Sequence, residues 1–148
     1  MTTATKSTTL ENWVAVYRGF NAVCAVVDRA LMVDLDLSIA QFQALLFLKE
    51  ASPCRNTDLA HNLVRQAQTL TGIIDRLEGK KYARRERHPK DRRAILVRLL
   101  PAGEKALEQA MPIVEAALPK AVERLNEGQR AMLIRLAASL EDNVCRRV

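Results

Sequence analysis

The feature that most constrains this chain is a basic segment that runs from Arg76 to Arg98. It contains ten lysines and arginines against three acidic residues, a net charge of +7, whereas the whole chain carries +6. The charge is therefore concentrated in one place. Within the segment, the turn-like residues 89–93 separate two short runs of strand character, and a helical pattern comes directly before it. A helix followed by a basic hairpin fits a DNA groove and its flanking phosphates.

The chain has 148 residues, of which 49% are hydrophobic and 27% charged, so we expect one globular domain with a buried core. No apolar run approaches the roughly 18–20 residues needed to span a membrane. Residues 1–7 lack the apolar stretch of a signal peptide, which predicts a cytoplasmic protein. Cys24, Cys54 and Cys145 are odd in number and form no CxxC pair, so we expect neither a metal site nor a disulfide framework, and no cofactor.

Helical periodicity covers the first third of the chain. Capping-box spacing over residues 8–11 predicts a helix that runs to about Val33, and apolar positions nearly encircle it. That distribution indicates burial against more than one partner. A second capping box, Ser38 with Gln41, predicts another helix that ends before Ser52-Pro53.

Two more helices precede the basic hairpin. The first is short, and we expect Asn56 or Thr57 to cap it. The second runs from about 66 to 78 on one clean apolar stripe, with Gly79 as its stop. At 100° per residue its opposite face is polar and carries Arg65, Gln68, Thr69, Gly72, Asp75 and Arg76.

Residues 82–88 and 94–99 are predicted to form two strands around the turn. Pro101 suits the first turn of a fifth helix, which we expect to be kinked or broken near Pro112 and Pro119. A third capping box, Asn126 with Gln129, predicts the last helix. The order of elements predicts a mostly α (α+β) fold: a winged helix-turn-helix with a two-stranded basic wing and long helices at both ends.

The fourth helix carries the groups that reading a major groove requires. Gln68 and Thr69 lie in its first turn and can bond to base edges, and Gly72 lets the helix approach the bases closely. Arg65 and Arg76 flank this face and can hold phosphates. An arginine at the hairpin tip can enter a narrow minor groove. The hairpin cations are Arg84, Arg85, Arg87, Lys90, Arg92 and Arg93. The alternative is a solvated helix face beside an ordinary basic loop.

Four pieces of sequence stand out together: Asp58-Leu59-Ala60, residues 69–78, Asp91-Arg92-Arg93-Ala94 and Gly103. Their order and spacing over residues 38–103 resemble the DNA-binding core of the MarR-type transcriptional regulators, and the flanking helices match in length and position. Two places depart from the family pattern. Lys80-Lys81 replaces the usual Lys-Gly, which bears on the angle at which the wing leaves the helix. Leu99-Leu100-Pro101 replaces the usual Leu-Thr, which removes a capping hydroxyl but leaves Pro101 to begin the next helix.

The resemblance implies a homodimer that binds a pseudo-palindromic site on double-stranded DNA, most often as a repressor. It divides the chain into a dimerisation helix (1–36), a DNA-binding core (37–100) and C-terminal dimerisation helices (101–148). By the same similarity, Arg92 enters the minor groove and Asp91 steers a neighbouring arginine. The residues facing the major groove are then Gln66, Gln68 and Thr69.

MarR-type proteins often respond to small aromatic or phenolic acids bound where the terminal helices meet the winged domain. Trp13, Tyr17 and Phe20 share one helical face, with Arg18 beside them and His61 on the third helix. Together they can enclose an aromatic ring and pair a carboxylate. The alternative is that the aromatic residues are dimer core, and that Arg18 and His61 are surface residues.

Three other functions remain open from the sequence. Other members of the family sense oxidation at a cysteine early in the first helix; Cys24 lies about ten residues deeper, although a bridge to Cys145 of a second chain stays possible. The basic hairpin can also serve a helical interaction module for an acidic protein or RNA, or a binder of nucleic acid without an operator. An enzyme has little support, because His61 and His88 are far apart and no phosphate loop or nucleophile motif is present.

Overall fold

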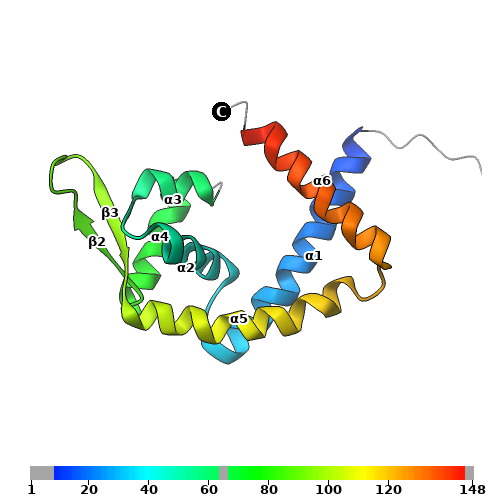
Figure 1. The fold of residues 1–148 in the computed structure, drawn as a ribbon, viewed down its shortest axis with the longest axis horizontal. Helices are drawn as coiled ribbons and strands as arrows, with labels where there is room; N and C mark the ends of the chain where they lie inside the picture. The colour runs from blue at the N-terminus through cyan, green and yellow to red at the C-terminus, as the bar shows by residue number, and fades with distance from the viewer. Residues whose placement is uncertain (1–8, 64–66, 146–148) are drawn as a thin grey trace, which may run out of the picture.

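The computed structural model describes residues 9–63 and 67–145. Figure 1 shows a winged-helix half, with α2, α3, α4 and the β-hairpin, at one end of the molecule and helices α1 and α6 at the other. Helix α5 runs along the base and joins the two halves. In chain order the elements are α1 (Thr9–Leu35), α2 (Ile39–Ala51), β1 (Cys54–Arg55), α3 (Asn56–Asn62), α4 (Ala67–Gly79), β2 (Ala83–Arg87), β3 (Ile95–Leu99), α5 (Pro101–Val122) and α6 (Glu127–Cys145).

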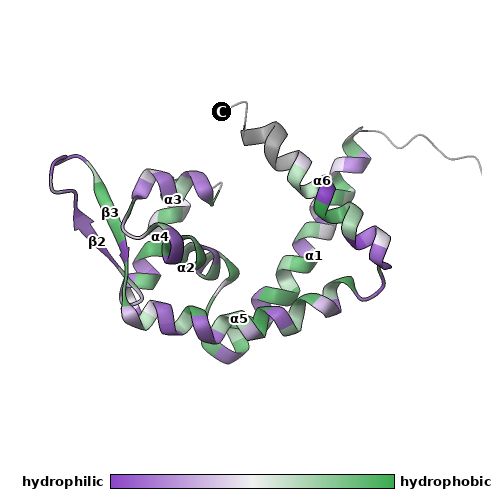
Figure 2. Ribbon diagram, viewed as in Figure 1, coloured by the Kyte–Doolittle hydropathy of each residue, from purple (hydrophilic) through white to green (hydrophobic). Residues whose placement is uncertain are grey.

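The core lies where α2, α4 and β3 meet the second half of α1 and the first half of α5. Its fully buried side chains include Leu31, Leu45, Leu77 and Val97, and the predicted stripe of α4 is buried along its whole length. In Figure 2, β3 is largely hydrophobic while β2 and the loop between them are hydrophilic. Burial of the apolar stripes is what holds the winged-helix half together.

The predicted capping boxes that fall on described residues are confirmed. At the start of α2, the Ser38 hydroxyl accepts from the Gln41 backbone N–H at 3.2 Å, and the Gln41 side chain accepts from the Ser38 N–H at 2.9 Å. Asn126 and Gln129 make the same reciprocal pair before α6, at 2.9 and 3.0 Å. Thr8, the first residue of the box predicted over residues 8–11, lies outside the described residues.

The sheet has a third strand that the sequence did not predict. It is antiparallel with the order β1-β3-β2, and β1 pairs Cys54 with Val97 and Arg55 with Leu96. This pairing keeps the chain extended up to Arg55, so α3 begins directly after it with Arg55 as the N-cap residue and no side-chain capping bond. The predicted cap by Asn56 or Thr57 is therefore wrong.

Helix α5 is continuous from Pro101 to Val122, so it is not broken near Pro112 and Pro119, and the kink that was the other expectation there stays a prediction. Its side chains on both sides of Pro112 pack inward: Ala110 and Ala117 are buried, and Ile113 packs against the core. The packing compensates for the helical hydrogen bonds that the two prolines lack. No single helix in the described ranges is long and apolar enough to cross a membrane.

Candidate nucleic-acid interface

The outer face of α4 is small and polar, as the periodicity predicted. Thr69, Gly72, Asp75 and Arg76 are exposed opposite the buried stripe. Apart from its chain neighbours and the nearby backbone of α4, no atom of the described residues lies within 4 Å of the position that a Cβ on Gly72 would take, so this part of the helix surface is open. Arg65 and Gln66 lie outside the described residues, and so does the side chain of Gln68.

A tight turn carries the chain from α4 into the wing. The backbone N–H of Tyr82 donates to the Leu77 carbonyl at 2.8 Å, and that of Lys81 donates to the Glu78 carbonyl at 2.9 Å. These two bonds make a Schellman motif, whose left-handed residue is Lys81 with φ of 58°. Gly79, the predicted stop after a helix ending at about 78, is instead the last helical residue and does not take the left-handed conformation. Lysine at 81 therefore adopts the conformation that suits glycine.

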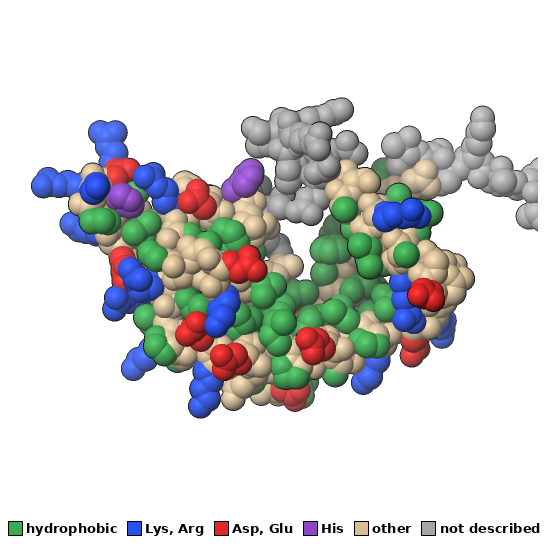
Figure 3. All heavy atoms as spheres, viewed as in Figure 1, with side chains coloured by type: hydrophobic (Ala, Val, Ile, Leu, Met, Phe, Trp, Pro, Cys, Tyr) green, Lys and Arg blue, Asp and Glu red, His purple; other side chains and the backbone are tan. Residues whose placement is uncertain are grey.

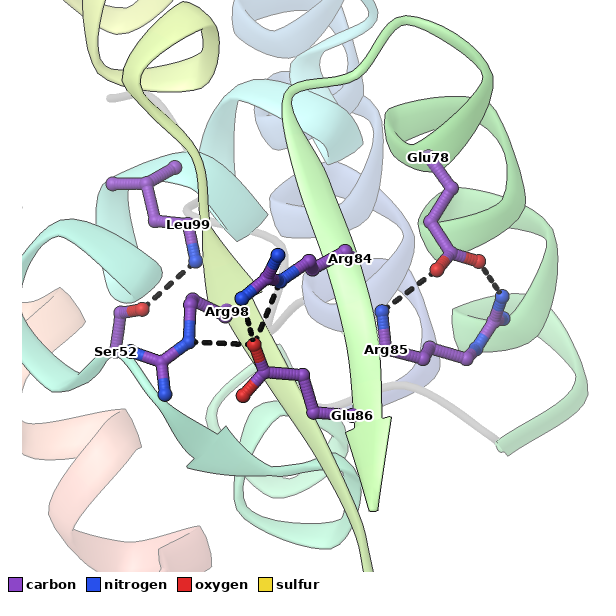
Figure 4. A network of polar contacts seen from close by, with 7 residues as sticks. All are labelled: Ser52, Glu78, Arg84, Arg85, Glu86, Arg98 and Leu99. Carbon is purple, nitrogen blue, oxygen red and sulfur yellow. Dashed lines mark hydrogen bonds and ion pairs between the residues drawn. The ribbon is translucent and has the colours of Figure 1, made fainter.

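Two arginines at the base of the wing share one carboxylate (Figure 4). Glu86 Oε1 accepts from Arg84 Nε at 2.7 Å and from Arg98 Nε at 2.8 Å, which ties β2 to β3. The bond from Arg98, with help from Arg84, lowers the pKa of Glu86, and Glu86 raises the pKa of Arg98. The Ser52 hydroxyl accepts from the Leu99 N–H at 2.8 Å and joins the end of α2 to β3.

Arg85 points the other way, toward α4 (Figure 4). Its guanidinium lies 2.7 Å from Asp75 Oδ1, pairs with the Glu78 carboxylate, and donates to the Thr71 carbonyl at 3.3 Å. Its backbone N–H donates to Glu78 Oε1 at 2.7 Å. The structure thus places this predicted DNA-contacting side chain against the helix.

The tip of the wing is held by its own polar groups. His88 Nδ1 accepts from the backbone N–H groups of Lys90 and Asp91 at 3.2 and 3.1 Å. Asp91 Oδ1 accepts from the Arg93 N–H at 3.1 Å, while Asp91 Oδ2 lies 3.6 Å from a guanidinium nitrogen of Arg55. Asp91 therefore pairs with an arginine from β1, which sequence analysis missed because that strand was not predicted.

The cations of the wing fall into two groups. Arg87, Lys90, Arg92 and Arg93 make no ion pair with any described residue, and all four are exposed. Figure 3 shows lysine and arginine side chains projecting around this end of the molecule. Arg84 and Arg85 are paired with acids of the protein itself. The exposed group and the open face of α4 form a cationic surface that can bind nucleic acid.

Known proteins resemble this chain in sequence and in fold. A family model described as the MarR family matches residues 37–95. The HTH-type transcriptional regulator YpoP of Bacillus subtilis is 30% identical over 110 residues, which cover 74% of this chain and 78% of YpoP. The chain belongs to the MarR family. It is accordingly a DNA-binding transcriptional regulator with a winged helix-turn-helix.

Two further relatives bear on regulation. The HTH-type transcriptional repressor NicR of Pseudomonas putida is 26% identical over 110 residues, covering 74% of this chain and 70% of NicR. The solved structure of BpsR from Bordetella bronchiseptica, whose DNA binding 6-hydroxynicotinic acid regulates, matches with a TM-score of 0.80 at 25% identity. The match covers 88% of this chain and 98% of BpsR.

The residues predicted to bind an effector do not meet within one chain. The Trp13 and Tyr17 rings stack with centroids 5.3 Å apart, and both are exposed, as are Phe20 and Arg18. His61 is exposed on α3, in the winged-helix half, while the first turns of α1 lie at the opposite end (Figure 1). A second copy of the chain would have to bring the two sets together.

A cavity of about 640 Å³, open to solvent, lies instead between the second half of α1 and α5. Its lining is mostly apolar, with Arg29, Asp34 and Lys120 as its charged groups. Cys54 is buried in β1, where burial, and then the charge of Asp58, raise the pKa of its thiol. Cys24 is half-buried, and the side chain of Cys145 lies outside the described residues.

Proposed function

We propose that this MarR-family protein is a cytoplasmic, homodimeric repressor that binds a specific pseudo-palindromic operator. The observation that carries the proposal is the group of exposed cations at the wing tip, which form no ion pair with a described residue, beside a helix whose outer face is polar. Such a surface supplies phosphate contacts from the wing and base contacts from the helix, with no catalytic step.

In this proposal each part of the surface has its own role. Gln66, Gln68 and Thr69 read base edges in the major groove, and Gly72 lets α4 approach them. Arg92 at the tip enters the minor groove, with Asp91 holding the turn. The phosphate contacts come from Arg65, Arg76, Arg87, Lys90 and Arg93.

Exposed apolar side chains support the dimer. In the single chain the first half of α1 exposes Trp13, Val16 and Phe20, and α6 exposes Leu133 and Ile134. An exposed apolar surface of this kind on two helices marks a protein interface. A second copy that covers it would present two winged helices related by twofold symmetry, which matches a pseudo-palindromic site.

The test is binding to a duplex that carries the chain's own upstream region against a random duplex of equal length. We expect a preference of roughly 10³ or more for the upstream region. The logarithm of the binding constant should also fall steeply with the logarithm of salt concentration. Equal affinity for both duplexes would contradict operator recognition and favour a non-specific binder or an interaction module.

Two glycines of α4 provide a matched pair of variants. Gly72→Ala and Gly79→Ala both add a methyl group where nothing lies within 4 Å, so each should stabilise the helix by about 0.5–1 kcal/mol. Only Gly72 lies on the proposed DNA-facing surface. We expect Gly72→Ala to weaken operator binding while Gly79→Ala leaves it unchanged. Equal binding by the two variants would place the helix farther from the bases.

We further propose that an aromatic carboxylic acid relieves repression from the cavity between α1 and α5. The volume is in the range of small-ligand sites, and Arg29 and Lys120 can pair a carboxylate. The regulation of BpsR by 6-hydroxynicotinic acid supports this class of ligand. A panel of hydroxylated aromatic acids should release the operator and raise the melting temperature of the wild type, and Arg29→Gln should blunt both effects. No response to any acid would remove this part of the proposal.

A further inference from the structure

Arg85 stands apart from the other wing cations because its side chain is largely engaged by one helix. Its three acceptors on α4 are Thr71, Asp75 and Glu78, spaced i, i+4 and i+7. That spacing places them on a single face of the helix, spread over two turns. Since the Glu78 carboxylate also accepts from the backbone N–H of Arg85, the strand and the side chain are both fixed to the helix.

We propose that Arg85 is a positioning residue for DNA binding, which fixes the angle between α4 and the wing and does not itself contact DNA. The inference rests on the proposed function of the two elements. The planar guanidinium offers several donors in a fixed geometry, so it can hold acceptors on two helical turns at once. A lysine at this place would offer one point charge and could not do so.

Arg85 favours DNA binding through the geometry that it imposes on α4 and the wing, more than through the energy of its ion pairs. Partly exposed ion pairs contribute little to stability. When α4 and the wing are joined rigidly, however, they bind DNA as one unit, because docking α4 in its groove also places the wing at its own groove. If the wing could swing freely, each binding event would have to restrict that motion first.

A direct DNA contact by Arg85 would work against the charges around it. To reach a phosphate, the guanidinium would leave Asp75 and Glu78, and both carboxylates would then stand unpaired beside the DNA. Repulsion between those carboxylates and the phosphates would oppose binding. Arg87, two residues further along β2, is exposed and has no ion pair with a described residue, so it is free to contact a phosphate.

Two variants distinguish a positioning role of Arg85 from a direct contact with DNA, because the two roles predict different affinities for the operator. Arg85→Lys keeps the charge, so a phosphate-contacting residue would lose little, whereas loss of positioning should weaken operator binding on the order of tenfold. Asp75→Ala/Glu78→Ala removes two negative charges and releases Arg85. Direct contact then predicts tighter binding, and positioning predicts weaker binding. The matched control is Glu108→Ala/Glu115→Ala, which removes two exposed acids from α5 and should tighten binding slightly.

Coupling to the wing tip separates positioning from a general loss of folding. In the wild type, Arg92→Ala should weaken operator binding strongly; in Arg85→Lys it should cost fewer-fold, because the tip is no longer held at its groove. Additive effects, or wild-type affinity in Arg85→Lys, would overturn the inference. If the wild type itself shows no operator preference, the proposed function fails first, and the role of Arg85 in DNA binding falls with it.

Discussion

The two halves of this molecule treat similar apolar stripes in opposite ways. In the winged-helix half, Leu45, Leu77 and Val97 are fully buried within one chain. In the first half of α1 and in α6, Trp13 is 59% exposed and Ile134 is 70% exposed. The comparison teaches that periodicity predicts which face of a helix needs a partner, but not whether the same chain supplies it. The winged-helix half buries its stripes within one chain, whereas the exposed stripes of α1 and α6 are the surface that we propose a second copy covers.

Replacing one large side chain by alanine in each half should give the largest difference, because one substitution affects folding stability and the other affects self-association. Leu77→Ala should lower the free energy of unfolding by about 2–5 kcal/mol, independently of protein concentration, because it opens a cavity in a complete core. Phe20→Ala should instead weaken self-association, so its effect on the melting temperature should grow as the protein is diluted. Sedimentation velocity across a dilution series checks this. An unchanged association state in Phe20→Ala would break the comparison.

Adding a single methyl group should also affect the stability of the two halves differently. A Cβ on Gly103 would lie 2.2 Å from the Tyr82 carbonyl oxygen and 2.8 Å from Leu99 Cδ1, at the junction of α5 and the wing. Gly103→Ala should therefore destabilise the fold by about 1–3 kcal/mol in chemical denaturation. Gly128→Ala in α6 meets only Asn126 Oδ1 at 3.5 Å, so it should be neutral or slightly stabilising. Similar losses in both variants would contradict the assignment of a tight junction to the winged-helix half.

The turn between α4 and the wing offers a smaller, stabilising change. Lys81 has a φ of 58°, and Lys81→Gly should raise the free energy of unfolding by about 0.5–1 kcal/mol because glycine adopts that conformation without strain. Lys81→Ala is the control, since it removes the same charge but keeps the Cβ. A gain of equal size in both variants would show that charge, and not backbone strain, is responsible.

The weakest expected effect concerns an ion pair that joins the end of α1 to the end of α4. Lys80 Nζ lies 2.8 Å from Asp36 Oδ2 and also donates to the Asp36 carbonyl. The hydrogen bond from Lys80, and then its charge, lower the pKa of Asp36. The stabilisation is therefore present above the ordinary aspartate pKa of about 3.9 and is lost as the pH falls through the lower value in the folded protein.

Asp36→Asn isolates this pair, because asparagine tolerates the left-handed φ of 49° that Asp36 adopts. The variant should be slightly less stable than the wild type near neutral pH. Chemical denaturation at a series of pH values should show the difference disappearing in acid. A difference that stays constant down to acidic pH would mean that the charge of Asp36 is not its source.

Several elements were predictable because their signals are local. The stripe of α4 and the boxes at Ser38 and Asn126 depend on residues a few positions apart, which the sequence displays directly. Strand β1 was missed because two residues show no period, and it exists only through its pairing with β3. Whether α5 breaks at its prolines was left open for a related reason: helix propensity takes account of the prolines but not of the packing on both sides of them.

The sequence by itself determined the local elements, the basic segment and the resemblance to the family, because each of these lies in short-range spacing and composition. Only the tertiary structure decided which of the clustered cations are available. Arg85 is held by acceptors on α4, Arg84 and Arg98 by Glu86, and the tip by Arg55 of β1. Apart from Arg84 and Glu86, which both lie on β2, these partners come from different elements and meet only after folding, so a charge count cannot distinguish an arginine that is paired within the protein from one that is available to bind DNA.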